Sequence, residues 1–230
     1  DDPETIDRMK GFIMDKSLQS THEDCLDHFP DLSWLEEELE KAFKYYKYYF
    51  PDKVIPIVYT YVSGFDYEYK TQFYNNNLIV ALDMYLGSDY DAYQQLGLPK
   101  YIIRKFTKEN IARDCVYEMA RSLTIHRAIG NKMLDQMIAE GKFLYFVKTL
   151  IPDLNDEVLF NYSEMQLNWA QENEGLVWAF MIENEVLYSA DLNYQQKFII
   201  DGPFTSYFGN DSPPRLGAYT GYKIVEAYMN

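Results

Sequence analysis

The spacing of hydrophobic and polar residues divides the chain into a short region of predicted strands and a longer region of predicted helices. Alternating β-branched and aromatic residues predict a strand at residues 53–62. Pro56 inside it indicates an edge position or a bulge. Two further strands are expected at residues 65–73 and 78–84, separated by an asparagine turn at residues 75–77.

Helical periodicity dominates the rest of the chain. Ser33 is expected to cap a helix that ends before Pro51. Gly141 is predicted to end another helix, and Ser163 with Gln166 forms the capping-box pattern of a long one. Beyond residue 89 we expect a loop at 199–214 and helices at 90–95, 99–106, 107–129, 131–140, 142–150, 163–182 and 217–229. The pattern predicts an α+β fold that is predominantly helical, with a small N-terminal sheet.

Length and composition favour one sizeable domain. The chain has 230 residues, of which 47% are hydrophobic and 17% aromatic, enough to fill a core. We expect a single domain over residues 32–230, preceded by a polar, weakly ordered segment at 1–31. Two cysteines, Cys25 and Cys115, are too few for a disulfide framework, so they are free buried thiols or a single pair.

Charge restricts the classes of partner. The formal net charge is -15, whereas nucleic acids and anionic membrane surfaces attract basic proteins. No apolar run is long enough to span a bilayer, and the first residues do not resemble an export signal. We therefore expect no nucleic-acid partner. The protein is either cytoplasmic or exported with its signal already removed.

The predicted helix at residues 107–129 carries the candidate chemistry. At about 100° per residue, its apolar side comprises Ile111, Ala112, Cys115, Val116, Met119 and Leu123. Its polar side comprises Asp114, Tyr117, Glu118, Arg121 and Ser122. The pentad at residues 117–121 reads YEMAR, and its outer positions lie about 6 Å apart along the helix.

That spacing matches the HExxH helix of zinc peptidases, but the residue types differ. There, two histidines grip zinc and the glutamate between them is the general base. Here Glu118 is present, while Tyr117 and Arg121 occupy the histidine positions. A guanidinium stays protonated and has no lone pair to offer a cation. No two of the three histidines have this spacing: His22, His28 and His126. A classical zinc hydrolase is therefore disfavoured.

Two interpretations of the pentad remain open. Glu118 and Arg121 belong either to a solvated helix face with local i,i+3 and i,i+4 pairs, or to a cleft retained from a peptidase-like ancestor. In the second case Glu118 is a vestigial catalytic residue, and Tyr117 and Arg121 are degenerate metal-site positions. Glu174, on a later predicted helix, then stands where such peptidases place a third ligand and could form a buried ion pair with Arg121. Alternatively, Glu172 and Glu174 are exposed helix charges.

Several phrases of the chain, taken together, resemble one family. They are LDMYLGSDY at 82–90, LPKYIIRKF at 98–106, MIAEGKFLYF at 137–146, residues 168–176, and LGAYTGYKIVEAYM at 216–229. Together they are similar to the gliding-motility lipoprotein GldB family of Bacteroidetes, over residues 32–230. That family in turn resembles gluzincin-type HExxH zinc peptidases, whose motif helix aligns with residues 117–121. The resemblance thus implies a zincin-like domain with a degenerate motif.

The resemblance also implies a cellular setting. It implies a lipoprotein of the cell envelope, on the periplasmic side or at the outer membrane, anchored through a lipidated cysteine upstream of residue 1. Contact with the membrane would be made only through that anchor. Envelope proteins of the gliding or secretion machinery are the implied partners.

Three functions follow as hypotheses. The leading one is a non-catalytic binding or assembly component that needs no cofactor. The second is a metal-dependent hydrolase using Glu118, with zinc held by an atypical set drawn from Glu174, an aspartate or His126. The third is a peptide- or glycan-binding module lined by tyrosines. No G-x-S-x-G elbow, phosphate-binding glycine loop or dinucleotide fingerprint is present.

Overall fold

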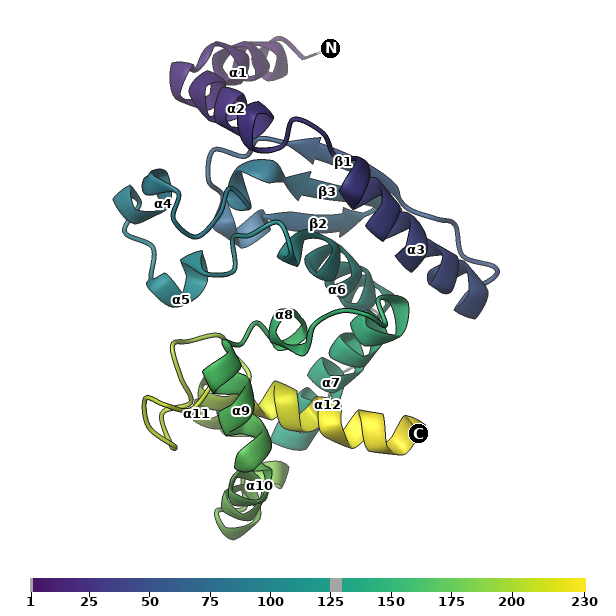
Figure 1. Ribbon diagram of the computed structural model, residues 1–230, viewed down its shortest axis with the longest axis vertical. Coiled ribbons are helices and arrows are strands. Elements are labelled where there is room, and N and C mark those ends of the chain that lie inside the picture. The colour runs from purple at the N-terminus through teal and green to yellow at the C-terminus, as the bar shows by residue number, and fades with distance from the viewer. Residues whose placement is uncertain (1, 125–129) are drawn as a thin grey trace. The chain divides into compact units, whose positions relative to one another are not determined.

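A computed structural model describes residues 2–124 and 130–230 (Figure 1). The fold is α+β and predominantly helical, with a small three-stranded sheet, so the predicted fold class is confirmed. The chain forms two compact units, Asp1–Cys115 and Val116–Asn230, each described below by itself. The expectation of a single domain over residues 32–230 stays a prediction.

Three helices open the first unit: α1 (Pro3–Met14), α2 (Lys16–His28) and α3 (Ser33–Tyr49). The segment at residues 1–31, which the sequence predicted to be polar and weakly ordered, contains α1 and α2. Asp15 caps α2 by accepting a hydrogen bond of 2.8 Å from the Ser17 N–H. Ser33 is the first residue of α3 rather than its cap, because the Asp31 carboxylate accepts from the Ser33 N–H at 3.1 Å.

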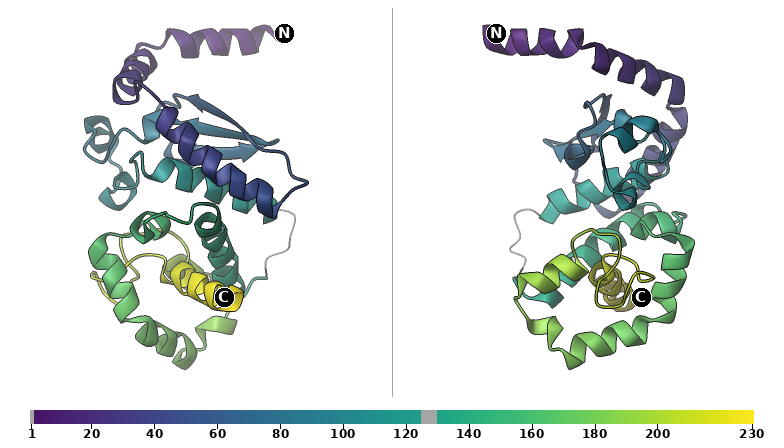
Figure 2. Two further views of the ribbon diagram at one scale, coloured as in Figure 1. Left: turned by 45° about the vertical axis from the view of Figure 1, so that its right-hand side comes forward. Right: turned by 90° about the vertical axis from the view of Figure 1, so that its left-hand side faces the viewer.

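The sheet contains β1 (Ile57–Tyr61), β2 (Thr71–Tyr74) and β3 (Asn77–Ala81). Its order is β1-β3-β2, with β1 parallel and β2 antiparallel to the central β3. Asn75 and Asn76 have φ values of 46° and 62°, which suits the predicted tight turn between β2 and β3. Figures 1 and 2 show α3 lying across the strands. Its buried residues are Leu35, Leu39, Ala42, Phe43 and Tyr46.

Short elements connect the sheet to the central helix: η1 (Tyr67–Tyr69), η2 (Leu82–Met84), α4 (Asp91–Gln95) and α5 (Lys100–Ile103). The 3-10 turn η1 shortens the strand predicted at 65–73. Helix α6 is described over Asn110–Thr124, so it begins three residues after the start of the helix predicted at 107–129. Residues 125–129 of that predicted helix, which include His126, lie outside the described residues.

The second unit is helical: α7 (Met133–Leu150), α8 (Asp156–Phe160), α9 (Glu164–Glu172), α10 (Glu174–Glu183), η3 (Val186–Tyr188), α11 (Leu192–Phe198) and α12 (Leu216–Met229). Figure 2 shows α8, α9 and α10 following one another around α12. The capping box of Ser163 and Gln166 is confirmed at the start of α9. The single helix predicted at 163–182 is wrong. It breaks at Asn173, whose side chain and N–H both bond the Trp169 carbonyl.

The crossing of α7 and α12 is the main packing contact of this unit. The prediction that Gly141 ends a helix is wrong, because this residue lies in the middle of α7. A Cβ on Gly141 would lie 2.3 Å from the Gly221 carbonyl oxygen, and one on Gly221 would lie 1.8 Å from the Met137 carbonyl oxygen. Both glycines are therefore required by the close approach of two backbones.

Candidate functional site

Helix α6 places the candidate pentad. The predicted apolar stripe is confirmed, since its buried residues include Ile111, Ala112, Cys115, Val116 and Met119. On the opposite side Tyr117 and Glu118 are half-buried and Arg121 is exposed. Asp114, assigned with these residues to the polar side or its edge, is buried, with only 5% of the residue exposed.

Asp114 lies at the centre of a buried polar network in the first unit. Its carboxylate accepts hydrogen bonds from Arg113 at 2.9 Å and from the Tyr85 hydroxyl at 2.9 Å, and it pairs with Lys70. Thr71 bonds Tyr85 in turn at 2.8 Å. Burial alone would raise the pKa of Asp114, but Lys70 and Arg113 hold it below its ordinary value. The carboxylate therefore remains ionised inside the fold.

Tyr117 is held in a second polar cluster, formed within the second unit with Glu140 of α7 and Arg215. Its hydroxyl donates to Glu140 Oε2 at 2.5 Å. One guanidinium nitrogen of Arg215 donates to that same oxygen at 2.6 Å and to the Tyr117 hydroxyl at 3.1 Å. Arg215 Nε donates to the Ile199 carbonyl at 3.1 Å. We call Tyr117, Glu140 and Arg215 the tyrosine–arginine cluster.

The cluster is poorly accessible to solvent and contains a permanently charged guanidinium. The side chains of Arg215 and Glu140 are 16% and 18% exposed. Burial opposes the charge of Arg215, but Tyr117 and Glu140 raise the pKa of its guanidinium above the ordinary value. The ring of Tyr117 also packs edge-on against Phe143, with centroids 5.8 Å apart. The tyrosine is thus fixed by packing as well as by hydrogen bonds.

Glu118 and Arg121 form an i,i+3 ion pair on the helix surface. Arg121 donates to Glu118 Oε1 at 3.0 Å, and the side chains of Arg121 and Glu118 are 58% and 26% exposed. The geometry is that of local pairing on a solvated face. Asp114, one turn earlier on α6, is not part of this ion pair.

Glu174 has a different partner from the one hypothesised. It is the first residue of α10 and is exposed, and its carboxylate accepts a hydrogen bond of 2.7 Å from the Tyr219 hydroxyl. Burial and then this bond raise the pKa of Tyr219 above its ordinary value. Within the described residues, no ion pair joins Arg121 to Glu174.

Zinc does not fit at Tyr117, Glu118 and Arg121. The phenol is bonded in the tyrosine–arginine cluster, and a guanidinium adjoins the glutamate and would repel a cation. Among residues 2–124 and 130–230, no three or more His, Cys, Asp or Glu side chains are grouped so as to hold a metal ion. The donor set that a zinc hydrolase needs is therefore not assembled around this pentad by the residues that the structure describes.

Both cysteines are buried free thiols, which decides between the two interpretations left open by the sequence. Burial, followed by the negative charges of Asp83 and Asp24, raises the pKa of Cys25 to about 12. A thiol that stays protonated is a poor nucleophile. These residues therefore belong to the core.

Comparison with known proteins gives the family. One family model matches residues 1–230, and its description is gliding motility protein GldB. The chain belongs to the GldB family. No curated protein and no solved structure matches it.

Membership of the GldB family makes the chain a lipoprotein associated with gliding motility. None of the helices described is both long enough and apolar enough to cross a membrane. The phrases through which the sequence resembles the GldB family include structural residues identified above. Tyr85 of the buried network lies in residues 82–90, Glu140 in residues 137–146, and Tyr219 in residues 216–229.

Two members of the tyrosine–arginine cluster were not predicted. Glu140 and Arg215 lie 23 and 98 positions from Tyr117, and no local spacing links them. One signal was available for Arg215. It is the only Lys, Arg or His between Lys197 and Lys223, and it stands between two prolines and an apolar helix. An isolated cation in such a position needs a carboxylate partner.

Proposed function

We propose that this protein is a non-catalytic cell-envelope lipoprotein that serves the gliding-motility or protein-secretion machinery as a binding or assembly component. In this proposal its scaffold is peptidase-like, and its partners are other envelope proteins. The tyrosine–arginine cluster is the observation that carries it. At one of the two positions that would hold the metal, Tyr117 is instead bonded to Glu140 and Arg215.

The second metal position supports the same proposal. A general base of a metallopeptidase must face a metal-bound water. Here Glu118 faces the cationic Arg121 at 3.0 Å. A fixed positive charge at this point disfavours a divalent ion nearby. The peptidase-like scaffold itself rests on the alignment of residues 117–121 with an HExxH helix.

The proposal is tested in cells. A strain lacking the gene is complemented with the native chain, with Glu118→Gln or with Arg215→Met, and colony spreading is measured. We expect Glu118→Gln to spread like the native strain, because the carboxylate performs no chemistry. We expect Arg215→Met to spread less at equal protein level, because the cluster orders the second unit. Loss of spreading with Glu118→Gln in a folded, normally abundant protein would contradict the proposal.

Metal analysis gives an independent test. Purified native chain is dialysed against buffer with and without zinc, and bound metal is measured by mass spectrometry. We expect far less than one ion per chain in both samples. Zinc retained at one ion per chain and lost in Glu118→Gln would support the metal-dependent hydrolase instead.

A peptide-binding role is the second candidate. It is favoured by an open apolar pocket in the second unit, and it is compatible with the first candidate, because an assembly component must bind its partners. The sequence left glycan binding open beside peptide binding. A glycan site would require polar groups turned toward the ligand.

A further inference from the structure

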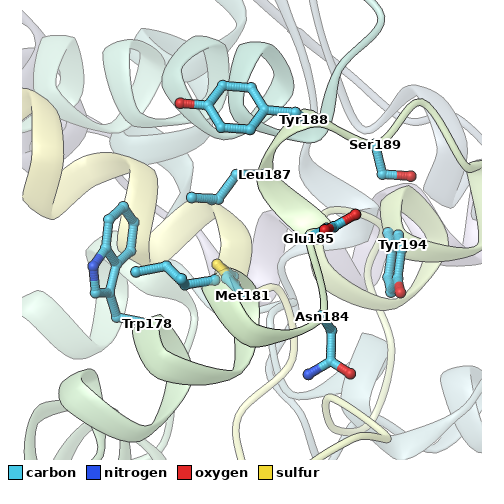
Figure 3. A pocket seen from close by; sticks show the side chains of 9 residues that line it. Trp178, Met181, Asn184, Glu185, Leu187, Tyr188, Ser189 and Tyr194 are labelled. Carbon is cyan, nitrogen blue, oxygen red and sulfur yellow. The ribbon is translucent and has the colours of Figure 1, made fainter.

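The second unit contains a pocket of about 800 Å³ at the junction of α10, η3 and α11 (Figure 3). Met181 and Leu187 are buried in it, with exposed fractions of 0% and 8%. Figure 3 shows Trp178 and Tyr188 beside them, and these residues are 39% and 70% exposed. The volume falls within the range of about 300–1,000 Å³ that is usual for ligand pockets. The pocket therefore offers an apolar base with exposed aromatic sides.

Two polar residues of the pocket lining, Asn184 and Ser189, are engaged by the protein itself. The Asn184 amide nitrogen donates to the Phe180 carbonyl at 2.9 Å. The Ser189 hydroxyl accepts from the Asp191 N–H at 3.1 Å. Glu185 is the one charged residue among the nine that line the pocket, and its carboxylate forms no ion pair among the residues that the structure describes. The pocket thus combines apolar surface with one uncompensated carboxylate.

The segment of sequence that supplies the pocket lining is strongly acidic. Between Lys148 and Lys197 there are nine Asp or Glu residues and no Lys, Arg or His. Lys132, from the residue before α7, approaches from outside this stretch, with its Nζ 5.6 Å from the centre of the Tyr188 ring. The Tyr188 ring is thus already in contact with the cation of Lys132, and the nine carboxylates of the stretch outnumber this one charge. The local potential therefore favours a positively charged ligand.

We propose that this pocket binds an apolar side chain carried by a lysine- or arginine-rich segment of a partner protein. The inference rests on the proposed binding role and names the chemistry of the partner. The buried base provided by Met181 and Leu187 receives the apolar group, while Glu185 faces the flanking cations. A glycan fits less well, because Asn184 and Ser189 already bond the backbone.

Binding is tested with three fluorescein-labelled peptides and the full chain, by fluorescence anisotropy. The first peptide, KKGLFLGKK, has the proposed chemistry. The second replaces every lysine with glutamate, and the third replaces LFL with SSS. We expect only the first to bind, with the other two weaker by about tenfold or more. Equal binding of the first and second peptides, or no binding of the first, would overturn the proposal.

Variants locate the site. Tyr188→Ala and Glu185→Lys change exposed side chains and are expected to weaken binding of KKGLFLGKK by about tenfold. The matched controls are Tyr228→Ala, at a residue 86% exposed on α12, and Glu23→Lys, at an exposed position of α2. Both controls should bind like the native chain. If the controls weaken binding as much as the pocket variants, the peptide binds elsewhere and the assignment is wrong.

Competition and sedimentation distinguish the other occupants. Displacement of the peptide by a neutral oligosaccharide would assign the pocket to glycans and overturn the proposal. Self-association that Tyr188→Ala abolishes would assign it to a second copy of this chain, with the same consequence. The proposed function is tested separately by colony spreading with Glu118→Gln. This substitution leaves the pocket unchanged, so loss of spreading would contradict the proposed function without bearing on the pocket.

Discussion

At the scale of single residues, Arg121 and Arg215 make the same kind of contact in different surroundings. Each pairs with a glutamate, but their side chains are 58% and 16% exposed. Exposed pairs contribute little to stability, whereas removing one partner of a buried pair leaves the other charge unpaired. We therefore expect Arg215→Met to lower the free energy of unfolding by about 3 kcal/mol, the lower end of the range for a broken buried pair. Urea denaturation measures this.

Arg121→Met is the matched control for that experiment. It removes the same guanidinium from a solvated helix face, and we expect a loss of less than about 1 kcal/mol. Equal losses for the two variants would mean that the tyrosine–arginine cluster is no more important to stability than a surface pair.

Because the pKa of Asp114 is lowered in the folded chain, we expect the free energy of unfolding to depend on pH. The pKa is lowered because Lys70 and Arg113 neutralise the carboxylate. A carboxyl whose pKa is lower in the folded state stabilises the fold above its unfolded pKa of about 3.9. This stabilisation is lost as the pH falls toward the folded pKa. We expect Asp114→Asn to destabilise the protein most at neutral pH, and the difference from the native chain to shrink below about pH 4.

Urea denaturation at several pH values measures that difference. Asp27→Asn is a suitable comparison, because Asp27 is exposed on α2. A difference between Asp114→Asn and the native chain that stayed constant down to the most acidic pH would show that the ionised carboxylate is not what stabilises the network.

At the scale of the elements, the crossing of α7 and α12 depends on two glycines. A Cβ at Gly221 would overlap the Met137 carbonyl oxygen. Relieving this overlap would require the two helix backbones to move apart, which would disrupt their packing. We expect Gly221→Ala to lower the free energy of unfolding by about 3 kcal/mol or more, at the upper end of overpacking effects. Gly175→Ala in α10, where nothing lies within 4 Å, should be neutral or stabilising by up to about 1 kcal/mol. Thermal denaturation compares the two, and similar midpoints would contradict the requirement for glycine.

The elements also show what sequence periodicity can predict. The capping box of Ser163 and Gln166 was predictable, because its hydrogen bonds join residues three positions apart. The role of Gly141 was not, because the reason for a glycine there is Gly221, 80 positions later in the chain. A glycine required by tertiary packing looks the same in a sequence as a glycine that ends a helix.

At the scale of the whole molecule, the candidate site was predictable only in part. The α+β class, the central amphipathic helix and the family all followed from local patterns and phrases. The partners of Tyr117 and Glu174 did not, because Glu140, Arg215 and Tyr219 are brought to them by tertiary structure. A single sequence shows which residues are present, but it does not show which of them contact one another in the folded chain.

The net charge of -15 predicts how the whole molecule responds to salt. Mutual repulsion of like charges destabilises the compact state, and it is screened as ionic strength rises from about 0.01 M to about 0.15 M. We expect the midpoint of thermal unfolding to rise by about 2–4 °C, as for a gain near 1 kcal/mol. Sodium chloride and choline chloride should act alike. A midpoint that falls with salt would mean that attractive ion pairs dominate instead.

Arg215 carries a consequence for the evolution of the family. Its φ of 54° places a large side chain in a backbone conformation that costs it about 1–2 kcal/mol and costs glycine almost nothing. Drift to glycine would relax this turn but leave Glu140 without its cation. Positions 140 and 215 should therefore mutate together, and homologous sequences should show that covariation even where the rest of α12 has diverged.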